Sequence, residues 1–503
     1  MKKLLTMILA ASLCWSCASD FLEEEKNPQA LSPSTFWKSE EDVLKGLTAA
    51  YASLQPSGDY ASSFERYMVA HCFRSDLCDK RDDVTSWIQV ASFTYESNNA
   101  VAANYWSYTF TGIYRANQVL DGVERVEGLD PELKKQYIAE ARFLRGYYYW
   151  NLYLNFGGML PLWDKPVSDE SGYKPAQSTP EAILEFIKKD FEYAQAELED
   201  EYASTWAGRV TKGAADVMMG KFLLQQKKYG EAANEFKKVV YSPLYGLNDN
   251  YNDNFDGLHK NSKEGIFEVQ FSGDRSGGKK EYSNITEHLA SSDATGYEEA
   301  YPTQWLYQVM LKDTTADGKM GPRILATIEC PGGFAMDADG HDVSYEEVHG
   351  DDATTIYWKK FVTWDESLSA EWWYSAFNIP LIRFSDVLLL YAEALNESAG
   401  PSTEVFTCIN DVRDRAKTPR IPTTWNQTQV REHIRHVERP CELAFEGSRW
   451  YDLVRWGIVS ETLKAHNKPN AANFTLGKHD LFPIPTSEFT LNKDWDQNPG
   501  YGK

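Results

Sequence analysis

A segment of 34 residues, 213–246, constrains the fold most strongly because its residues follow the spacing of a two-helix repeat. Small residues stand where two helices would cross, and bulky residues stand where the gaps between helices must be filled. These positions are Gly220, Leu223, Tyr229, Ala232, Phe236 and Val239. A unit of this size cannot bury its apolar face alone, so it needs similar units stacked against it.

Several other segments have the same helical character. Residues 178–198, 382–397 and 405–416 look like halves of further hairpins, and 104–126 and 131–162 are two long periodic runs joined by a polar turn. Cap-type residues precede an apolar pattern that predicts a first helix near Glu40. We therefore expect three or four imperfect tetratricopeptide-like repeats, within about 36–54, 104–246 and 378–457.

Two regions lack this periodicity and read as loop-rich surface. They are about 55–100 and 247–375, where Gly, Ser, Asp, Asn and Thr are frequent. Within the second region, 265–271 alternates in the manner of a short strand. The predicted fold class is mostly α, a tetratricopeptide-like helical repeat scaffold with a loop-rich, partly irregular insert and a few short strands.

The run from Glu438 to Gly457 carries the most regular charge pattern of the chain. Acidic and basic residues alternate at spacings of three and four, and apolar residues stand between them. The charged residues are Glu438, Glu442, Glu446, Arg449, Asp452 and Arg455. We expect one helix that buries its apolar face, exposes its charges to solvent and ends at Gly457. Its role is expected to be architectural, tying the C-terminal segment to the repeats.

These residues, ERPCELAFEGSRWYDLVRWG, resemble the signature of the SusD/RagB family of glycan-capturing outer-membrane lipoproteins. Further family-like motifs are IYRAN at 113–117, ARFLRG at 141–146, NFGGMLPL at 155–162 and a C-terminal run from His479 to Tyr501. The resemblance spans the mature chain and implies a single SusD-like body at 36–503. Pro440 departs from the pattern, because the family usually has a basic residue there.

The N-terminus has the features of an export signal. Lys2 and Lys3 precede an apolar run of about ten residues, too short to anchor the chain permanently across a bilayer. We expect a signal peptide at 1–16, lipidation of Cys17 and a lipidated acidic linker at 17–35. The acidic residues after Cys17 resemble the export tag of surface lipoproteins in the Bacteroidetes. The implied location is the cell outer membrane, lipid-anchored and exposed at the surface.

The formal net charge is -23, with 74 acidic and 51 basic side chains, so a phosphate backbone would be repelled and nucleic acid is not an expected partner. The chain contains 16 Trp and 29 Tyr, more than a helical core usually needs. Indole faces suit sugar rings, and neighbouring Asp and Asn side chains bind hydroxyl groups. From composition and location, the ligand-binding candidates are Trp87, Trp305, Trp358, Trp364, Asp76 and Asn98.

The sequence contains no recognisable catalytic or cofactor motif, so we expect no enzyme activity and no cofactor. Residues 252–263 imitate a calcium loop, but Lys263 stands where a bidentate Glu is needed. His433 and His436 lack a third ligand, and no metal site is assigned. Cys72 and Cys78 are close enough in sequence to pair if the fold permits.

The resemblance implies a protein that captures an oligosaccharide or polysaccharide non-covalently and delivers it to a SusC-like TonB-dependent transporter. Two alternatives from other classes remain. One is a surface glycoside hydrolase, because 74 acidic residues could include a catalytic pair. The other is a lipoprotein whose repeats bind a peptide or protein.

Overall fold

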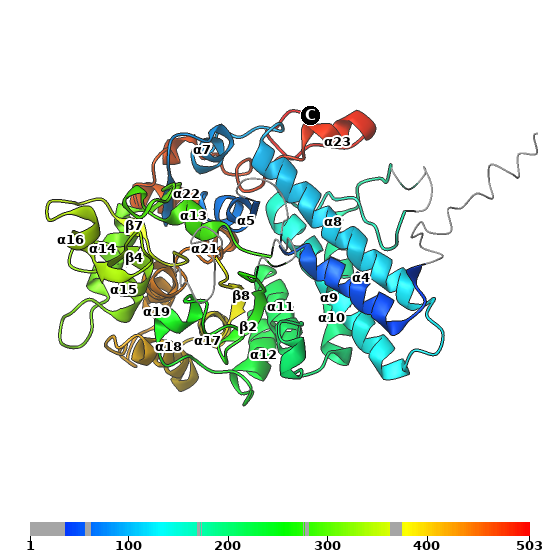
Figure 1. Ribbon diagram of the computed structural model, residues 1–503, viewed down its shortest axis with the longest axis horizontal. Helices are drawn as coiled ribbons and strands as arrows, with labels where there is room; N and C mark the ends of the chain where they lie inside the picture. Colours follow the sequence, from blue (N-terminus) through cyan, green and yellow to red (C-terminus); the bar gives the residue numbers. More distant parts are fainter. Residues whose placement is uncertain are drawn as a thin grey trace, which may run out of the picture.

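The computed structural model describes residues 36–55, 62–167, 172, 174–274, 276, 281–362 and 375–503. In these residues the chain is mostly helical, and its short strands form two-stranded antiparallel sheets (Figure 1). The predicted signal peptide, Cys17 and the acidic linker lie outside the described residues. No helix in the part of the chain that the structure describes is both long and apolar enough to cross a membrane.

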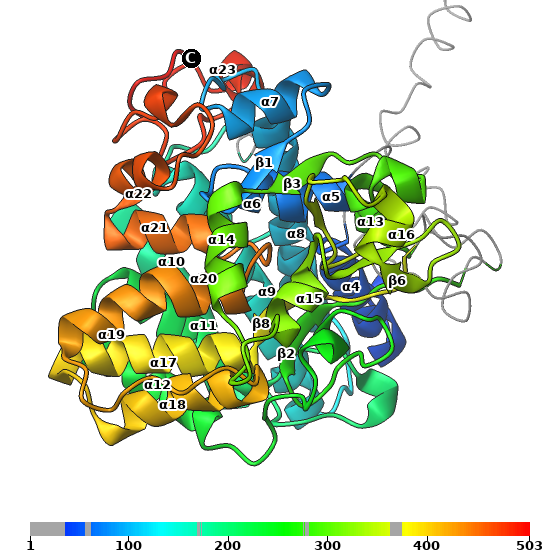
Figure 2. The ribbon, with the colours of Figure 1, turned by 90° about the vertical axis from the view of Figure 1, so that its left-hand side faces the viewer.

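Eight helices pack one against the next and form the scaffold that the repeat pattern predicts (Figures 1 and 2). In order of contact they are α4 (Glu40–Ala52), α8 (Ala100–Val123), α9 (Pro131–Phe156), α10 (Pro180–Glu197), α11 (Lys212–Gln225), α12 (Tyr229–Val240), α17 (Phe384–Ala399) and α18 (Thr403–Arg415). Helices α12 and α17 are neighbours although 143 residues separate them along the chain, Val240 to Phe384. The insert between them therefore leaves the scaffold and returns to it.

Small residues allow the scaffold helices to approach closely. A Cβ atom added at Gly220 would lie 2.4 Å from the Phe236 ring, and one at Gly112 would lie 2.5 Å from the Tyr148 ring. Both values are shorter than any ordinary carbon contact, so each ring occupies the space that a side chain would take. The first of these contacts confirms the crossing predicted within 213–246.

The insert consists of short elements held by paired strands. Strand β2 (Gly265–Val269) pairs antiparallel with β8 (Ile379–Arg383), which confirms the predicted strand and ties both ends of the insert to the scaffold. The other pairs are β1 (Cys78–Lys80) with β3 (Ala300–Pro302), β4 (Ile328–Glu329) with β7 (Tyr357–Trp358), and β5 (Phe334–Met336) with β6 (Asp342–Ser344). The insert helices are α13 (Ile285–Leu289), α14 (Gln304–Lys312), α15 (Pro322–Thr327) and α16 (Tyr345–His349).

The remaining helices lie in the first loop-rich region and in the C-terminal third. They are α5 (Ser62–Phe64), α6 (Ala70–Cys72), α7 (Thr85–Ala91), α19 (Gln427–His433), α20 (Arg439–Glu442), α21 (Arg449–Trp456), α22 (Val459–Ala465) and α23 (Thr486–Leu491), with π-helical turns at Glu65–Val69 (η1) and Ile434–Glu438 (η7). The C-terminus packs on the segment that follows α7, where the Tyr95 and Tyr501 ring centres lie 6.0 Å apart.

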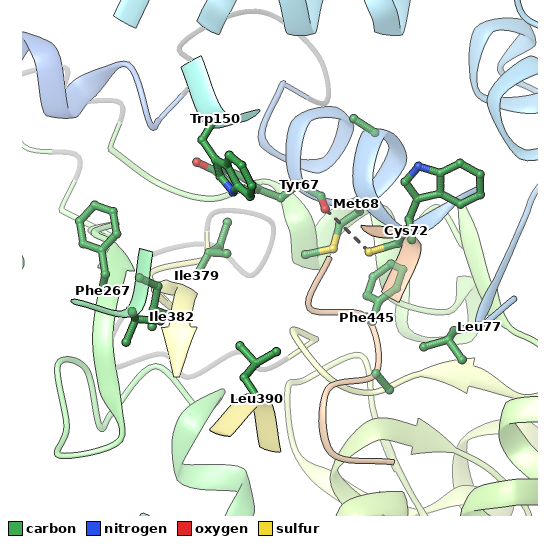
Figure 3. Close-up of a cluster of buried hydrophobic side chains, with 14 of the residues drawn as sticks. Tyr67, Met68, Cys72, Leu77, Trp150, Phe267, Ile379, Ile382, Leu390 and Phe445 are labelled. Carbon is green, nitrogen blue, oxygen red and sulfur yellow. Dashed lines mark hydrogen bonds between the residues drawn. The ribbon is translucent and has the colours of Figure 1, made fainter. Parts of the chain in front are cut away.

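One buried core joins the scaffold to the insert. Figure 3 shows side chains from η1, α9, β2, β8, α17 and the segment before α21 packed in one cluster. Trp150 comes from α9, Phe267 from β2 and Phe445 from the C-terminal segment, and all three are buried. Cys72 and Cys78 are both buried free thiols, so they do not form the disulfide left open by their spacing.

The C-terminal charged segment differs from its prediction in two respects. It is not one helix, because the chain turns between α20 and α21, where Phe445 and Gly447 both have positive φ. Pro440 lies in the first turn of α20, directly after the π-helical turn. Its ring carries no N–H, so it cannot donate a backbone hydrogen bond to the preceding turn. Gly457 ends α21 in the left-handed conformation, as expected.

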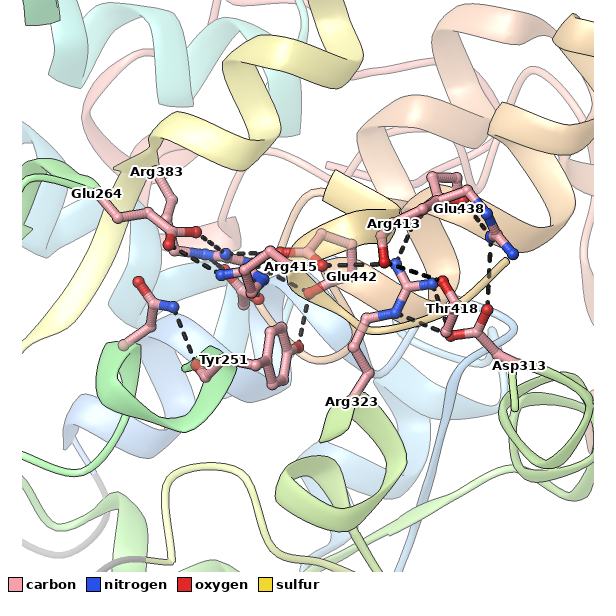
Figure 4. A network of polar contacts seen from close by, with 12 residues as sticks. Tyr251, Glu264, Asp313, Arg323, Arg383, Arg413, Arg415, Thr418, Glu438 and Glu442 are labelled. Atoms are coloured by element: carbon pink, nitrogen blue, oxygen red, sulfur yellow. Dashed lines mark hydrogen bonds and ion pairs between the residues drawn. The ribbon is translucent and has the colours of Figure 1, made fainter. Parts of the chain in front are cut away.

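The charges of this segment are buried, and the expectation that they face solvent is wrong. Glu442 contacts Arg323, Arg383 and Arg415, and Glu438 contacts Arg323 and Arg413 (Figure 4). The two glutamates have no exposed surface. A periodic charge pattern looks the same whether the opposing charges come from solvent ions or from distant parts of the chain. Here the partners come from β8, α15 and α18.

These ion pairs keep the buried carboxylates ionised. Burial alone would raise the pKa of Glu442, but Arg415, Arg383 and Arg323 outweigh it and lower this pKa to about 2. The pKa of Glu438 is likewise held well below its ordinary value, mainly by Arg323 against the effect of burial. The segment is therefore architectural, as predicted, although it acts as a buried ion network.

Candidate functional site

Two of the predicted ligand-binding tryptophans belong to the core. Trp87 is 3% exposed, and its Nε1 donates a hydrogen bond to Glu65 at 3.0 Å. Trp358 is completely buried and stacks on Phe445 with ring centres 4.3 Å apart. The expectation that these two indoles offer exposed stacking faces is wrong, because neighbouring elements cover them.

Asp76 and Trp305 do come together, but in a structural joint. Asp76 is fully buried and accepts hydrogen bonds from Nε and Nη2 of Arg449, both at 2.8 Å. His466 lies 2.7 Å from the same carboxylate, and the half-buried Trp305 stacks on the His466 ring at 3.6 Å. Burial would raise the pKa of Asp76, but Arg449 holds it far below its ordinary value. This group joins the turn between α6 and β1 to α14, α21 and the residue that ends α22.

The other two candidates are untested as ligand groups. Asn98 is exposed in the turn just before α8, and it stays a prediction. Trp364 lies outside the described residues.

The segment that imitates a calcium loop uses its acidic group within its own turn. Asp256 accepts hydrogen bonds from the backbone N–H groups of Leu258 and His259 at 2.8 and 3.1 Å. Its second oxygen lies 2.7 Å from Nδ1 of His259, and the pKa of His259 is raised mainly by this hydrogen bond. Asn254 donates to the carbonyl of Tyr251. These contacts explain the spacing without a bound ion.

One exposed and two partly exposed tyrosines lie where the two loop-rich regions meet, near the β1–β3 pair. We call this area the Tyr297 surface, and it consists of Arg81, Asp83, Tyr297, Glu298, Tyr301 and Tyr357. The backbone N–H of Arg81 donates to the carbonyl of Glu299 at 3.1 Å, which extends the strand pairing by one residue. The Arg81 guanidinium also donates to the carbonyl of Tyr297 at 2.5 Å. The β1–β3 pair thus fixes both halves of the surface.

The rings of this surface rest on buried neighbours. Tyr297 is 38% exposed, and its ring lies 5.5 Å from that of His288, which stacks on Phe64 in the core. Tyr301 and Tyr357 have ring centres 6.0 Å apart, and the Tyr301 hydroxyl donates to Glu298 at 3.1 Å. The neighbouring Glu287 carboxylate raises the pKa of Tyr297 above its ordinary value. The hydroxyl groups are therefore neutral donors at physiological pH.

The arrangement suits a polyhydroxylated ligand. Flat rings can pack against C–H groups of a sugar, while the Arg81 guanidinium and the Asp83 and Glu298 carboxylates can bind hydroxyls. Burial and the neighbouring Asp83 carboxylate raise the pKa of Glu299 to about 8.

The sequence prediction missed Tyr297 and Arg81. It selected tryptophans, whose rings are larger than that of tyrosine but are also highly buried on average. Tyr297 stands in a stretch of small and polar residues, 291–298, without helical periodicity. An aromatic residue in such a stretch has few apolar neighbours in sequence, and this was the available signal.

Two family models match this chain and together cover most of it. The model described as "SusD family" matches residues 263–501, and the one described as "Starch-binding associating with outer membrane" matches residues 20–224. The chain belongs to the SusD/RagB family. A SusD-like protein, P25, from Formosa agariphila is 26% identical to it over 97% of both chains. The starch-binding protein SusD of Bacteroides thetaiotaomicron is 24% identical over 79% of this chain and 78% of its own.

Solved structures of SusD-like proteins have the same fold. A SusD superfamily protein from Bacteroides vulgatus is 27% identical with a TM-score of 0.81, covering 93% of this chain and 100% of its own. A structure described as a laminarin-binding SusD-like protein is also 27% identical, with a TM-score of 0.76, covering 92% and 100%. The SusD-like architecture thus extends over nearly the whole chain, including the region that carries the Tyr297 surface.

Proposed function

We propose that this protein captures a glycan non-covalently at the cell surface and delivers it to a SusC-like TonB-dependent transporter. Membership of the SusD/RagB family supports glycan binding, as do relatives described as starch-binding and laminarin-binding. A family description that includes association with the outer membrane supports the location.

One observation carries the choice of site. Tyr297 combines 38% exposure with a ring backed by His288 and a backbone held by Arg81. An aromatic group that is exposed and already fixed loses little conformational entropy when a ligand stacks on it. We assign glycan contact to the Tyr297 surface for this reason.

Anchoring completes the proposed function. Lipidation of Cys17 would hold the body at 36–503 on the membrane through the acidic linker at 17–35, and a partner transporter would receive the glycan. Mass spectrometry of the mature N-terminus tests the anchor. Diacylglycerol on Cys17 is the expected result, and an unmodified N-terminus or a lipid on another residue contradicts it. Co-purification of a TonB-dependent porin from solubilised outer membranes tests the partner.

Electrophoresis through gels containing single polysaccharides tests the proposed binding. The panel is laminarin, soluble starch, xylan, mannan, alginate and polygalacturonate. We expect retardation of the wild-type protein in at least one gel. For Tyr297→Ala we expect affinity weaker by about fivefold or more, because truncating a central contact residue costs more than about 1 kcal/mol. Tyr114→Ala is the control, since Tyr114 is 48% exposed on α8, outside the Tyr297 surface.

The same material separates the alternatives. Release of reducing ends from a retained polysaccharide would contradict non-covalent capture and support a hydrolase. Retardation by no polysaccharide, together with binding to a peptide library, would support the peptide-binding alternative. Equal affinity of Tyr297→Ala and wild type would remove the Tyr297 surface from the proposal.

A further inference from the structure

A second aromatic groove lies away from the Tyr297 surface, at the end of the helical scaffold where α10, α11 and β2 meet. Its cavity volume is about 370 Å³, within the roughly 300–1,000 Å³ typical of small-molecule sites. Three segments line it, within 200–211, 244–245 and 261–268, and the last of them includes part of β2. None of its residues belongs to the Tyr297 surface or to the six sequence candidates.

The lining of this groove includes an exposed indole. Trp206 is 45% exposed and is the one tryptophan among the exposed large hydrophobic side chains in the part of the chain that the structure describes. Two further rings, Tyr202 and Tyr245, line the same groove. The Tyr245 hydroxyl is fixed by a hydrogen bond of 3.0 Å to Thr211.

Buried groups hold Trp206 in place. The Arg209 guanidinium lies 5.1 Å from the Trp206 ring centre and 4.9 Å from that of Tyr202. Arg209 is itself bound through two nitrogens to Glu140, which is completely buried on α9, with Nε donating at 2.8 Å. Tyr51 donates to the same carboxylate at 2.8 Å. An anchored scaffold carboxylate thus fixes the arginine that packs on the rings, so the aromatic platform is preorganised.

A glycine lets the loop take this path. Gly208 has φ of +90°, and a Cβ atom there would lie 2.6 Å from the Gln270 side chain. The conformation and the close contact both exclude an ordinary side chain. The turn after Trp206 is therefore fixed by the insert segment that carries Gln270.

The charges of the groove select the class of ligand. Asp200, Glu201, Glu268 and Lys263 line it, and Arg209 is paired with Glu140. The groove thus has a net negative charge on a chain of net charge -23, which disfavours anionic ligands. Carboxylates, an ammonium group and the Asn261 amide offer acceptors and donors for hydroxyls, beside flat rings. A neutral saccharide has the matching chemistry.

We infer that the groove around Trp206 is a second saccharide-binding site, specific for a neutral segment of a few sugar units. This inference rests on the proposed function, since it gives the same protein two separate contacts with a glycan. A protein with both sites binds two short oligosaccharides per chain and can hold a long polymer at two points.

Isothermal titration with a tetrasaccharide tests the inference. The tetrasaccharide is prepared from the polysaccharide that retards the wild type. If laminarin or starch does so, the probe is a glucose tetrasaccharide. We expect two sites per chain for the wild type and one for Trp206→Ala. Trp206→Phe keeps a flat ring and should keep both sites. Tyr114→Ala, at matched exposure, should also keep both. Melting temperatures verify that each variant is folded at the temperature of the titration.

The outcomes are separable. Retardation of the wild type by no polysaccharide overturns the proposed function and this inference together. One site in the wild type, or two sites unchanged in Trp206→Ala, overturns the Trp206 groove alone. Loss of one site in Trp206→Ala with unchanged binding in Tyr297→Ala supports the groove and overturns the Tyr297 surface. If alginate or polygalacturonate retards the wild type, and Trp206→Ala loses one binding site for the uronate tetrasaccharide, the assignment to a neutral sugar is overturned.

Discussion

Replacing Arg449 with alanine tests whether the C-terminal charged segment stabilises the fold and takes no part in binding. Two nitrogens of Arg449 donate to Asp76 at 2.8 Å, and both side chains are almost wholly buried. The variant leaves the Asp76 carboxylate with His466 as its one remaining ion-pair partner among the described residues. Removing one member of a buried ion pair costs about 3–5 kcal/mol, because the other charge stays buried.

The expected shift in melting temperature follows from the size of the chain. An unfolding entropy of about 2.1 cal/mol/K per residue gives roughly 1 kcal/mol/K for 503 residues. A loss of about 3–5 kcal/mol therefore lowers Tm by about 3–5 °C if the chain unfolds in one step. Differential scanning calorimetry measures both Tm and the unfolding enthalpy.

Arg420→Ala is the matched control. Arg420 forms an ion pair with Asp414, but their side chains are 67% and 43% exposed. An exposed pair contributes about 0–1 kcal/mol, so the Tm of this variant should change by less than about 1 °C. Glycan affinity of the folded protein should be unchanged in both variants. Equal Tm shifts in the two variants, or lost glycan binding by Arg449→Ala at unchanged Tm, would refute the reasoning.

Three further predictions concern packing and pH. Gly220→Leu should destabilise the fold by about 1–3 kcal/mol in urea denaturation, because the side chain collides with Phe236; Gly230→Ala, with no atom within 4 Å of the added Cβ, should not. Burial raises the pKa of Glu299 to about 8. The stability that the protonated Glu299 contributes is therefore fully present below about pH 4.5 and is lost as pH rises through 8. Glu299→Gln should flatten the Tm–pH curve over that range, and an unchanged slope would contradict it. Burial lowers the pKa of His71 to about 3, so Tm should fall on acidification from pH 6.5 towards 3.

The scaffold was predictable because its signals are local. Gly220 and Phe236 are 16 residues apart, and helix caps, turns and apolar spacing all lie within a few residues of the structures they specify. The strand at 265–269 was predictable from alternation for the same reason. The family motifs added the global arrangement.

The ion network was not predictable, because its partners are distant in sequence. Glu438 meets Arg323 across 115 residues, and Arg449 meets Asp76 across 373. Periodicity shows that charges share a helical face, but it does not show what covers that face. The same limit applies to Trp87 and Trp358, whose burial depends on elements that pack over them only in the complete fold.

The candidate binding residues were harder to predict than the fold. Arg81, Asp83 and Tyr297, which we propose as contact residues, fall within the expected loop-rich segments. Trp87 and Trp358 are buried, because exposure cannot be inferred from residue type, and Asn98 and Trp364 stay predictions. Trp206 lies outside both segments, in a connection between two scaffold helices where no ligand group was expected.

The contact between Asp76 and Arg449 also constrains the order in which the chain can fold during synthesis. Asp76 leaves the ribosome long before Arg449, and until the latter arrives its carboxylate has no arginine to accompany it into the interior. Burying an unpaired carboxylate is costly, so the segment around Asp76 closes only once Arg449 is available. Pairings over such separations also slow folding. The joint between Asp76 and Arg449 therefore forms late, after most of the chain has been made.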